Sequence, residues 1–291
     1  MMDNYARRVI VDAQPKGLGY NPTLLNAIYT PQFHNRTMAT VAPTRQDYTL
    51  TVEAFAALHR QSAVFAEEYM SRFDPSHDFA HVQRVARLAQ RLASAPAASP
   101  PAETQTQSQT PHQQLDSNIV ALAALLHDVG DHKYVDPATD MSTPSPLSAG
   151  AVARPVEAFL LSAGAPTALA RGVQTVVTHV SFSHESGNPD AVRRVLAIYP
   201  ELGVVQDADR LDALGAVGLA RCFAFGAAKM PQRGLGGCVD HIDDKLVRLE
   251  PLMKTAAGRT LARERTRRVV EFQRWWLDEV ADAREAVDEI M

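Results

Sequence analysis

Cysteine is scarce in this chain of 291 residues, which contains only Cys222 and Cys238. Two cysteines are too few for the disulfide framework of a small secreted domain, and they are consistent with a reducing compartment. We therefore expect both to be free thiols. Long apolar runs are lacking as well, because a stretch such as residues 119–126 is far shorter than the roughly 20 residues that a membrane-spanning helix needs.

The chain also has no large excess of charge of one sign. It contains 29 Lys and Arg residues and 33 Asp and Glu residues, for a formal net charge of −4. Such a balance gives no strong positive electrostatic potential that would bind a polyanion, so a nucleic-acid polymer is not expected as the main partner. The polar start of the sequence, Met1-Met2-Asp3-Asn4, has no signal-peptide pattern. We expect a cytoplasmic protein, with a nuclear location as the alternative, and no membrane partner.

The length and the hydrophobic content of 46% suffice for one large domain with a buried core. Residues 1–47 show no sustained periodicity and are predicted to form an irregular N-terminal extension. Residues 48–291 are predicted to form the domain, because apolar residues recur there at steps of three and four. Residues 94–117 are rich in Pro, Ala, Gln, Thr and Ser, which predicts a flexible inserted loop whose deletion is tolerated.

Helical periodicity dominates the predicted domain, and we find no run of alternating apolar residues that indicates a strand. The sequence therefore predicts an all-α bundle. Beyond the segments discussed below, helices are expected at residues 152–163, 167–180, 191–199, 204–225, 242–255 and 260–290.

The first segment with chemical side chains holds His77 and His81. Residues four apart are neighbours on a helix, so both histidines share one face if the helix already runs at His77. Taken alone, His81 fits a buried histidine bonded to a backbone carbonyl as well as it fits a functional group. The same two readings apply to His179, which follows an apolar stripe further along the chain.

The second segment places His127 and Asp128 directly after eight apolar residues, 119–126. Such a run predicts a helix that is buried nearly all round, with Gly130 as a natural C-terminal cap. Burying both polar groups without partners is unfavourable by several kcal/mol. A divalent cation of the Mn, Fe or Mg type that both groups coordinate removes this penalty. A helix cap with a salt bridge is the alternative interpretation.

The third segment places Asp207, Asp209 and Asp212 in an otherwise apolar helix. On a period of 3.6 residues, Asp209 and Asp212 share a face while Asp207 points elsewhere, so the three carboxylates cannot all have one role. A solvated acidic face is the alternative to a functional site here.

The order of these segments resembles the HD-domain superfamily of metal-dependent phosphohydrolases, which place a His, a His-Asp pair and a distal Asp around one metal. The strings HDFAHV at residues 77–82, LLHDVGDHK at 125–133 and QDADRLDALGA at 206–216 resemble, more narrowly, a bacterial and fungal subfamily of nucleotide pyrophosphohydrolases. The resemblance continues through residues 241–259 and covers roughly residues 53–279. It implies an HD-domain helical bundle with additional C-terminal helices.

The resemblance also implies a ligand set of His81, His127, Asp128 and Asp209. Asp207 is the competing fourth ligand. One divalent ion is expected, Mn first and Mg, Fe, Co or Ni as alternatives. His77 is a candidate for substrate binding or for orienting the start of its helix.

Further roles follow from the charge of a phosphate substrate. Asp131 is a candidate general base for the attacking water. Lys133 and Arg84 are candidate phosphate-binding cations, and Lys133 is also a candidate catalytic residue. Arg210 is either a third such cation or one half of a surface salt bridge.

We therefore expect a hydrolase for a small phosphate compound, namely a nucleotide, that releases pyrophosphate from nucleoside or deoxynucleoside triphosphates. A nucleoside monophosphate phosphatase or a phosphodiesterase uses the same ligand set. A non-catalytic metal-binding regulatory module is the alternative of another class. In that case Trp275 and Trp276 dock a partner, whereas otherwise they are core or homodimer contacts.

Overall fold

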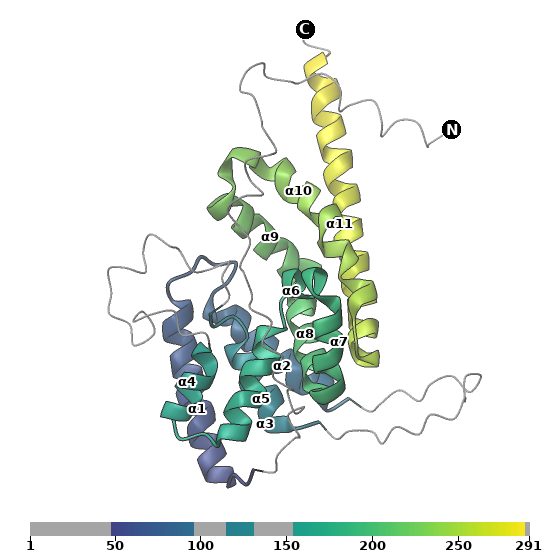
Figure 1. The fold of residues 1–291 in the computed structure, drawn as a ribbon. Helices are drawn as coiled ribbons and strands as arrows, with labels where there is room; N and C mark the ends of the chain where they lie inside the picture. The colour runs from purple at the N-terminus through teal and green to yellow at the C-terminus, as the bar shows by residue number, and fades with distance from the viewer. Residues whose placement is uncertain (1–47, 96–114, 131–153, 289–291) are drawn as a thin grey trace, which may run out of the picture. The chain divides into compact units, whose positions relative to one another are not determined.

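A computed structural model of the chain describes residues 48–95, 115–130 and 154–288. These residues are almost entirely helical and contain no strand, which confirms the predicted all-α class. The predicted N-terminal extension and nearly all of the predicted insertion lie outside these ranges, so both stay predictions. The α-helices are α1 (Val52–Met70), α2 (Phe79–Ala93), α3 (Ser117–Leu126), α4 (Pro155–Ser162), α5 (Thr167–Thr178), α6 (Phe182–Gly187), α7 (Pro189–Ile198), α8 (Glu201–Asp212), α9 (Gly215–Lys229), α10 (Gly234–Asp244) and α11 (Ala256–Asp288), as labelled in Figure 1.

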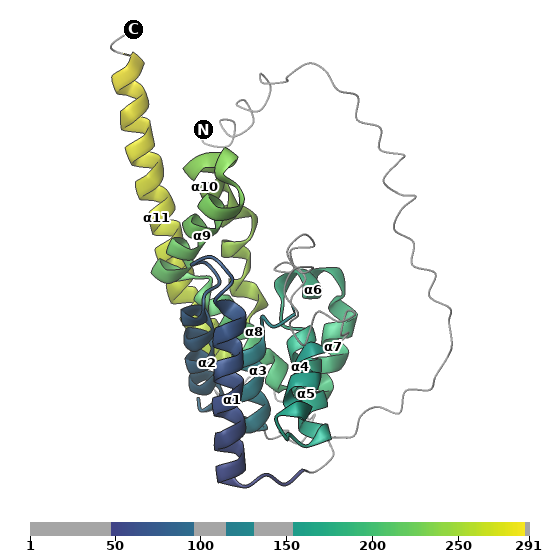
Figure 2. The same cartoon turned by 90° about the vertical axis from the view of Figure 1, so that its left-hand side faces the viewer.

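Helix α3 forms the centre of the bundle. Seven of its ten residues are buried, as the unbroken apolar run predicts. It packs against α1, α2, α5 and α8, and the second view shows α1, α2, α3 and α8 running beside one another (Figure 2). Because apolar burial is the main favourable term in folding, this central helix fixes where its C-terminal end lies. That end carries His127 and Asp128.

The start of α2 is set by Asp78, whose carboxylate accepts a hydrogen bond of 2.9 Å from the backbone N–H of His81. A side-chain cap of this kind contributes about 1 kcal/mol to helix stability. Since the cap is at residue 78, His77 precedes the helix. The condition under which His77 and His81 would share one helix face is therefore not met.

The predicted helix over residues 204–225 is in fact two helices, α8 and α9, which meet at an angle of 73°. Gly215 lies at the break with φ of +73°, a backbone conformation that strains other residues. No single helix within the described ranges is long and apolar enough to cross a membrane. Only α8 and α9 taken together pass that test of length and composition, and α8 is buried in the bundle.

The predicted helix over residues 242–255 is also wrong. Helix α10 ends at Asp244, and two short 3-10 helices follow, Leu246–Arg248 and Glu250–Leu252. Pro251 has no backbone N–H to donate, so a continuous α-helix is not favoured here. Helices α6 and α10 were not predicted. Together with α9, they line the cavities described below.

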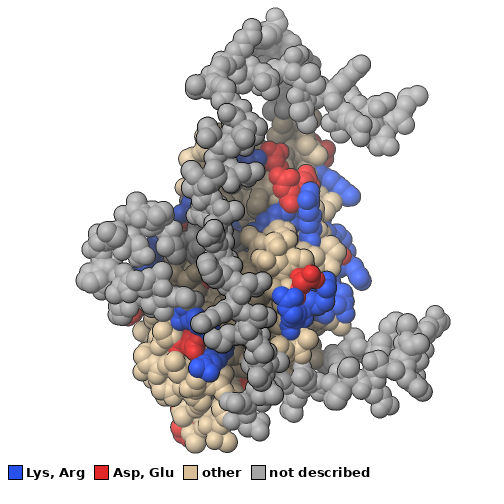
Figure 3. Space-filling view, viewed as in Figure 1, with Lys and Arg blue, Asp and Glu red and all other residues tan. Residues whose placement is uncertain are grey.

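Helix α11 packs along α8 and α9, and its outer side carries charges of both signs (Figures 1 and 3). In the coloured part of the face shown in Figure 3, the basic and acidic side chains are interspersed. Trp276 packs against Phe223 and Phe272, whereas Trp275 is 57% exposed. Cys222 and Cys238 are free and buried, which confirms the prediction for the two thiols.

Candidate metal centre

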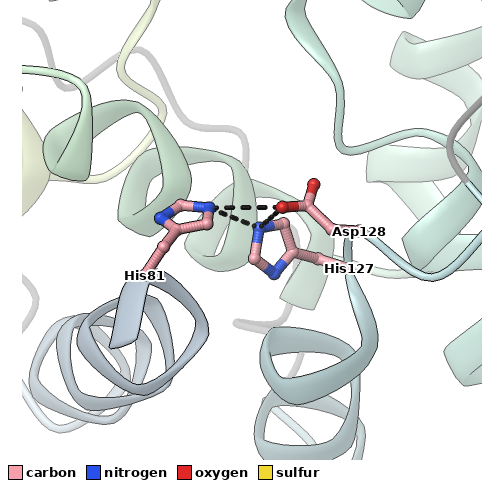
Figure 4. Close-up of side chains that lie close together, drawn as sticks. All are labelled: His81, His127 and Asp128. Atoms are coloured by element: carbon pink, nitrogen blue, oxygen red, sulfur yellow. Dashed lines mark hydrogen bonds and ion pairs between the residues drawn. The ribbon is translucent and has the colours of Figure 1, made fainter. Parts of the chain in front are cut away.

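Three helices bring four candidate metal ligands to one point. His81 lies in the first turn of α2, His127 and Asp128 follow the last residue of α3, and Asp209 lies on α8. The Nε2 atoms of His81 and His127 are 3.1 Å apart, and Oδ2 of Asp128 lies 3.3 Å and 3.4 Å from them. Figure 4 shows these three side chains pointing toward one another. Oδ1 of Asp209 lies 3.7 Å from Nε2 of His81 and 3.8 Å from Nε2 of His127.

Both imidazole rings are held by a hydrogen bond at the nitrogen that faces away from this point. Nδ1 of His127 lies 3.0 Å from the carbonyl oxygen of Ala124, and Nδ1 of His81 lies 2.8 Å from Oδ2 of Asp212. Because a carbonyl and a carboxylate only accept, each Nδ1 carries a proton, and in the neutral ring each Nε2 then presents a lone pair. Metal-binding histidines are typically held in this way. Two lone pairs at 3.1 Å repel each other unless a cation or a proton lies between them.

The donor set fits a divalent ion. Ligand atoms bound side by side at about 2.1 Å in an octahedron are roughly 3 Å apart, which is close to the separations among His81, His127 and Asp128. These three donors all lie within 4.8 Å of one another, and Asp209 is the outermost of the four. The buried Oδ2 of Asp128 accepts no hydrogen bond, although buried carboxylates normally do. A bound ion would supply the missing partner.

The charges of the cluster also favour a cation. Burial acts to raise the pKa of Asp128, but the three histidines His77, His81 and His127 outweigh it and hold that pKa well below its ordinary value. Burial acts to lower the pKa of His81, but the carboxylates of Asp128 and Asp212 outweigh it and raise that pKa above its ordinary value. The site thus keeps an ionised carboxylate in a nearly closed environment. Such a carboxylate is unfavourable without a positive partner.

Asp212 is a functional residue whose role the sequence did not reveal. Its carboxylate is 2% exposed and accepts hydrogen bonds from His81, from Arg84 at 2.8 Å and 3.0 Å, and from Arg221 at 3.2 Å. These contacts and the charges of its partners outweigh burial and lower the pKa of Asp212 well below its ordinary value. Asp212 is three residues after Asp209, so the sequence predicted that the two share one helix face. Its partners on α2, His81 and Arg84, lie far away in the sequence, so the sequence did not indicate these contacts.

The competing ligand, Asp207, lies elsewhere. Its carboxylate accepts hydrogen bonds from the backbone N–H groups of Lys254 and Thr255, at 2.8 Å and 2.7 Å, and from the Thr255 hydroxyl. A side chain at Gly258 would meet this carboxylate at 2.3 Å, so the glycine makes room for it. Asp207 therefore holds the chain at the start of α11, and Asp209 is the fourth candidate ligand.

The structure does not support the role predicted for Arg84. Its guanidinium is bound to Asp212 behind His81, and it does not line the cavity beside the metal-binding cluster. Arg84 thus positions the carboxylate of Asp212, and that carboxylate in turn positions the His81 ring. Asp131 and Lys133 lie outside the described residues, so their predicted roles as general base and phosphate-binding cation stay predictions.

Arg210 is not a surface cation: it lines the cavity beside the four candidate ligands, so its predicted role as a phosphate-binding cation stays a prediction. It is 2% exposed, forms an ion pair with Glu185 on α6, and donates a hydrogen bond of 3.0 Å to the carbonyl of Leu252. Glu185 also accepts a hydrogen bond of 2.8 Å from Nζ of Lys254. This network of Arg210, Glu185 and Lys254 connects α6, which lines the cavity, to α8 and to the segment before α11.

Replacing Glu185 by glutamine should destabilise the fold, because Arg210 and Lys254 then lose their anionic partner. Breaking a buried ion pair typically destabilises by 3–5 kcal/mol, and since Glu185 is 17% exposed we expect about 2 kcal/mol. Chemical denaturation in urea measures this change. Glu264→Gln is the matched control, because Glu264 pairs with Arg268 on the surface and should contribute about 0.5 kcal/mol or less.

The effect of Glu185→Gln should depend on pH. Burial acts to raise the pKa of Glu185, but Lys254 and Arg210 outweigh it and hold that pKa below its ordinary value of 4.5. A carboxyl group with a lowered pKa stabilises the fold fully above its unfolded value, and this contribution is lost as the pH falls through the folded value. The difference between the parent and Glu185→Gln should therefore be full at pH 7 and shrink below pH 4.5. A constant difference contradicts this account.

A cavity of about 290 Å³ opens beside the cluster. His77, Arg221 and Lys245 line it together with the four candidate ligands. His77 is predominantly buried, and this burial lowers its pKa to about 4, so its ring is neutral at pH 7. His179, in contrast, lies outside this cavity and bonds through Nδ1 to the carbonyl of Thr175 at 2.8 Å. Arg210 lines the cavity as well, so the arrangement can place a small anion next to a bound ion and three cationic side chains.

Comparison with known proteins identifies relatives of this chain. Residues 78–214 match the family model of the HD domain. The chain is 33% identical over 218 residues to the uncharacterized protein YpgQ of Bacillus subtilis, an alignment that covers 74% of this chain and 89% of YpgQ. The crystal structure of Bacillus subtilis YpgQ in complex with ADP matches with a TM-score of 0.53 and 26% identity, over 78% of this chain and 96% of that one. A crystal structure from Lactobacillus plantarum, at 24% identity and a TM-score of 0.55, covers 80% of this chain and 100% of its own and has the same fold.

The region that matches the HD domain runs from Asp78, which caps α2, to Leu214, the residue before α9. It therefore contains all four candidate ligands and Asp212. The relationship to YpgQ extends well beyond it, over about three quarters of the chain. The sequence motifs, the fold and the convergence of the two imidazoles and two carboxylates all indicate the same family. The chain belongs to the HD-domain superfamily of metal-dependent phosphohydrolases.

Proposed function

We propose that the protein is a nucleotide pyrophosphohydrolase that uses one divalent ion, Mn²⁺ in the first place, to release pyrophosphate from nucleoside or deoxynucleoside triphosphates. This proposal rests on one observation: His81, His127, Asp128 and Asp209 lie close together beside a cavity that three cationic side chains also line. The same four residues are the ligands that the sequence resemblance implied.

The chain's own residues prepare the site for an anionic substrate. Asp212 and the carbonyl of Ala124 keep the Nε2 lone pairs of both histidines turned to one point. Arg221 and Lys245 line the cavity and balance the charge of phosphate oxygens. When bound, a divalent ion lowers the pKa of a water molecule and polarises a phosphoryl group. We further propose that Asp131 accepts the proton of the attacking water and that Lys133 binds a phosphate oxygen.

The choice of a nucleotide rests on two observations. The strings at residues 77–82, 125–133 and 206–216 resemble nucleotide pyrophosphohydrolases, and the related YpgQ has been crystallised with ADP. A phosphatase or a phosphodiesterase would use the same ligands, because the metal recognises the phosphate and the pocket walls select the rest of the substrate. The products therefore distinguish the three reactions.

The test is a product analysis of purified protein with Mn²⁺ or Mg²⁺ and a panel of nucleoside mono-, di- and triphosphates and phosphodiesters. We expect triphosphates to give a monophosphate and pyrophosphate, resolved by ion-exchange chromatography, and we expect EDTA to stop the reaction. Release of orthophosphate from monophosphates identifies a phosphatase instead. Metal binding without turnover of any compound supports a regulatory module and contradicts the proposal.

A further inference from the structure

A second cavity, of about 640 Å³, adjoins the one beside the metal-binding cluster. Its walls come from α6, α9, the end of α10 and the residues just before α2. The two cavities share five lining residues, so they lie side by side with a common boundary. These shared residues are His77, Phe182, Ala213, Arg221 and Lys245.

The walls of the second cavity differ from those of the first. Two aromatic rings, Phe182 and Phe225, lie in it together with the apolar side chain of Leu246. Hydrogen-bonding groups are also present, among them Ser183 and Asp244. Pockets for small organic molecules are typically 300–1,000 Å³ in volume and combine apolar and aromatic walls with a few polar groups. The second cavity has these properties, whereas the first is smaller and surrounded by ionisable groups.

Positive charge is concentrated at the boundary between the cavities. The Arg221 guanidinium is fixed by hydrogen bonds to the carbonyl of Ser76, at 2.7 Å, and to Asp212, at 3.2 Å. Nζ of Lys245 lies 6.0 Å from the centre of the Phe182 ring. An anionic chain that runs from the metal-binding cluster into the second cavity passes these two cations. Charge-assisted contacts of this kind are the strong ones for phosphate groups.

We propose that the second cavity binds the nucleoside part of the substrate, with the base against the aromatic rings and the phosphate chain between Arg221 and Lys245. This inference rests on the proposed function, because it places the two halves of a nucleotide relative to the ligands. On this assignment the protein should bind nucleotides more tightly than inorganic polyphosphates, because only a nucleotide fills both cavities. Stacking of a base on an aromatic side chain is worth about 1–3 kcal/mol, which corresponds to roughly 5–150-fold in affinity.

The experiment compares two ligands that share a diphosphate and differ in the nucleoside, namely ADP and inorganic pyrophosphate. Ser183→Trp fills the second cavity from α6, since Ser183 lines that cavity and not the first. Ser186→Trp is the matched control on the exposed part of the same helix. Titration calorimetry of the full chain with Mn²⁺ should show ADP binding weakened about tenfold or more by Ser183→Trp, with pyrophosphate binding changed less than about twofold. Ser186→Trp should change neither.

Phe225→Leu provides an independent variant that keeps apolar volume and removes a ring, and it should weaken ADP binding selectively as well. Unchanged ADP affinity in both variants, or an equal loss for ADP and pyrophosphate, overturns the assignment of the cavity. In those cases the parent still hydrolyses nucleotides, so the proposed function survives. If the parent neither binds ADP nor hydrolyses any nucleotide, the proposed function and this inference fail together.

Discussion

Replacing Asp128 by alanine should reduce hydrolysis by roughly a thousandfold at saturating Mn²⁺, because it removes a charged ligand and an electrostatic component of the site. The carboxylate oxygen involved lies 3.3 Å and 3.4 Å from the two imidazole nitrogens and has no hydrogen bond of its own. Among the described residues, the other carboxylate within reach of both histidines is Asp209, which is itself a candidate ligand. Initial rates of pyrophosphate release measure the effect.

Two further variants make this result interpretable. Asp128→Asn keeps the shape of the side chain and loses only the charge, so it should remain folded and lose most of the activity. Asp190→Ala removes an exposed carboxylate that pairs with Arg193 on α7, and it should behave like the parent. Thermal unfolding of all three proteins shows whether the fold is retained. Equal activity in the parent and in folded Asp128→Ala contradicts the assignment of the metal-binding site.

Replacing Asp212 by asparagine should weaken Mn²⁺ binding by about 10–100-fold, the usual loss when a partner of a metal-binding histidine is removed. The neutral amide holds the His81 ring less firmly than the carboxylate that now accepts from Nδ1 at 2.8 Å. Arg84 and Arg221 lose an anionic partner at the same time. Titration with Mn²⁺, followed by activity or by calorimetry, measures the change.

A positioning role for Asp212 predicts a specific form of this loss. Raising the Mn²⁺ concentration should restore a large part of the activity of Asp212→Asn, because all four ligands remain in place. Arg84→Gln is a milder second variant, since it leaves the bond from His81 to Asp212 intact and should weaken binding less. An activity loss in Asp212→Asn that no concentration of Mn²⁺ relieves, with an unchanged metal affinity, contradicts a positioning role.

The helical periodicity of the sequence predicted the fold class, and the structure brings together the four candidate ligands that the family resemblance implied. An unbroken apolar run followed by His127 and Asp128 identifies a buried helix that ends in polar groups, and burial then requires a partner for them. The spacing in the third segment also separated Asp209 from Asp207, as the structure shows: the former faces the histidines and the latter holds the start of α11.

The parts that sequence reasoning missed depend on partners far apart in the chain. Arg84 looked like a phosphate-binding cation, but its partner Asp212 is 128 residues away, and only the packing of α2 on α8 brings them together. Arg210 is likewise paired with a residue on α6, a short helix that the apolar pattern did not indicate. The break at Gly215 was missed because the sequence on both sides is equally helical, and the positive φ depends on how α9 turns back.

The central claim is that these four side chains hold one divalent ion. The most direct test is to titrate Mn²⁺ into metal-free protein, to count the bound ions by electron paramagnetic resonance, and to repeat the titration with the ligand variants His81→Ala and His127→Ala. We predict one tightly bound Mn²⁺ per parent chain and at least a hundredfold weaker binding in each variant. Binding of the same stoichiometry and affinity in the parent and in both folded variants would contradict the account.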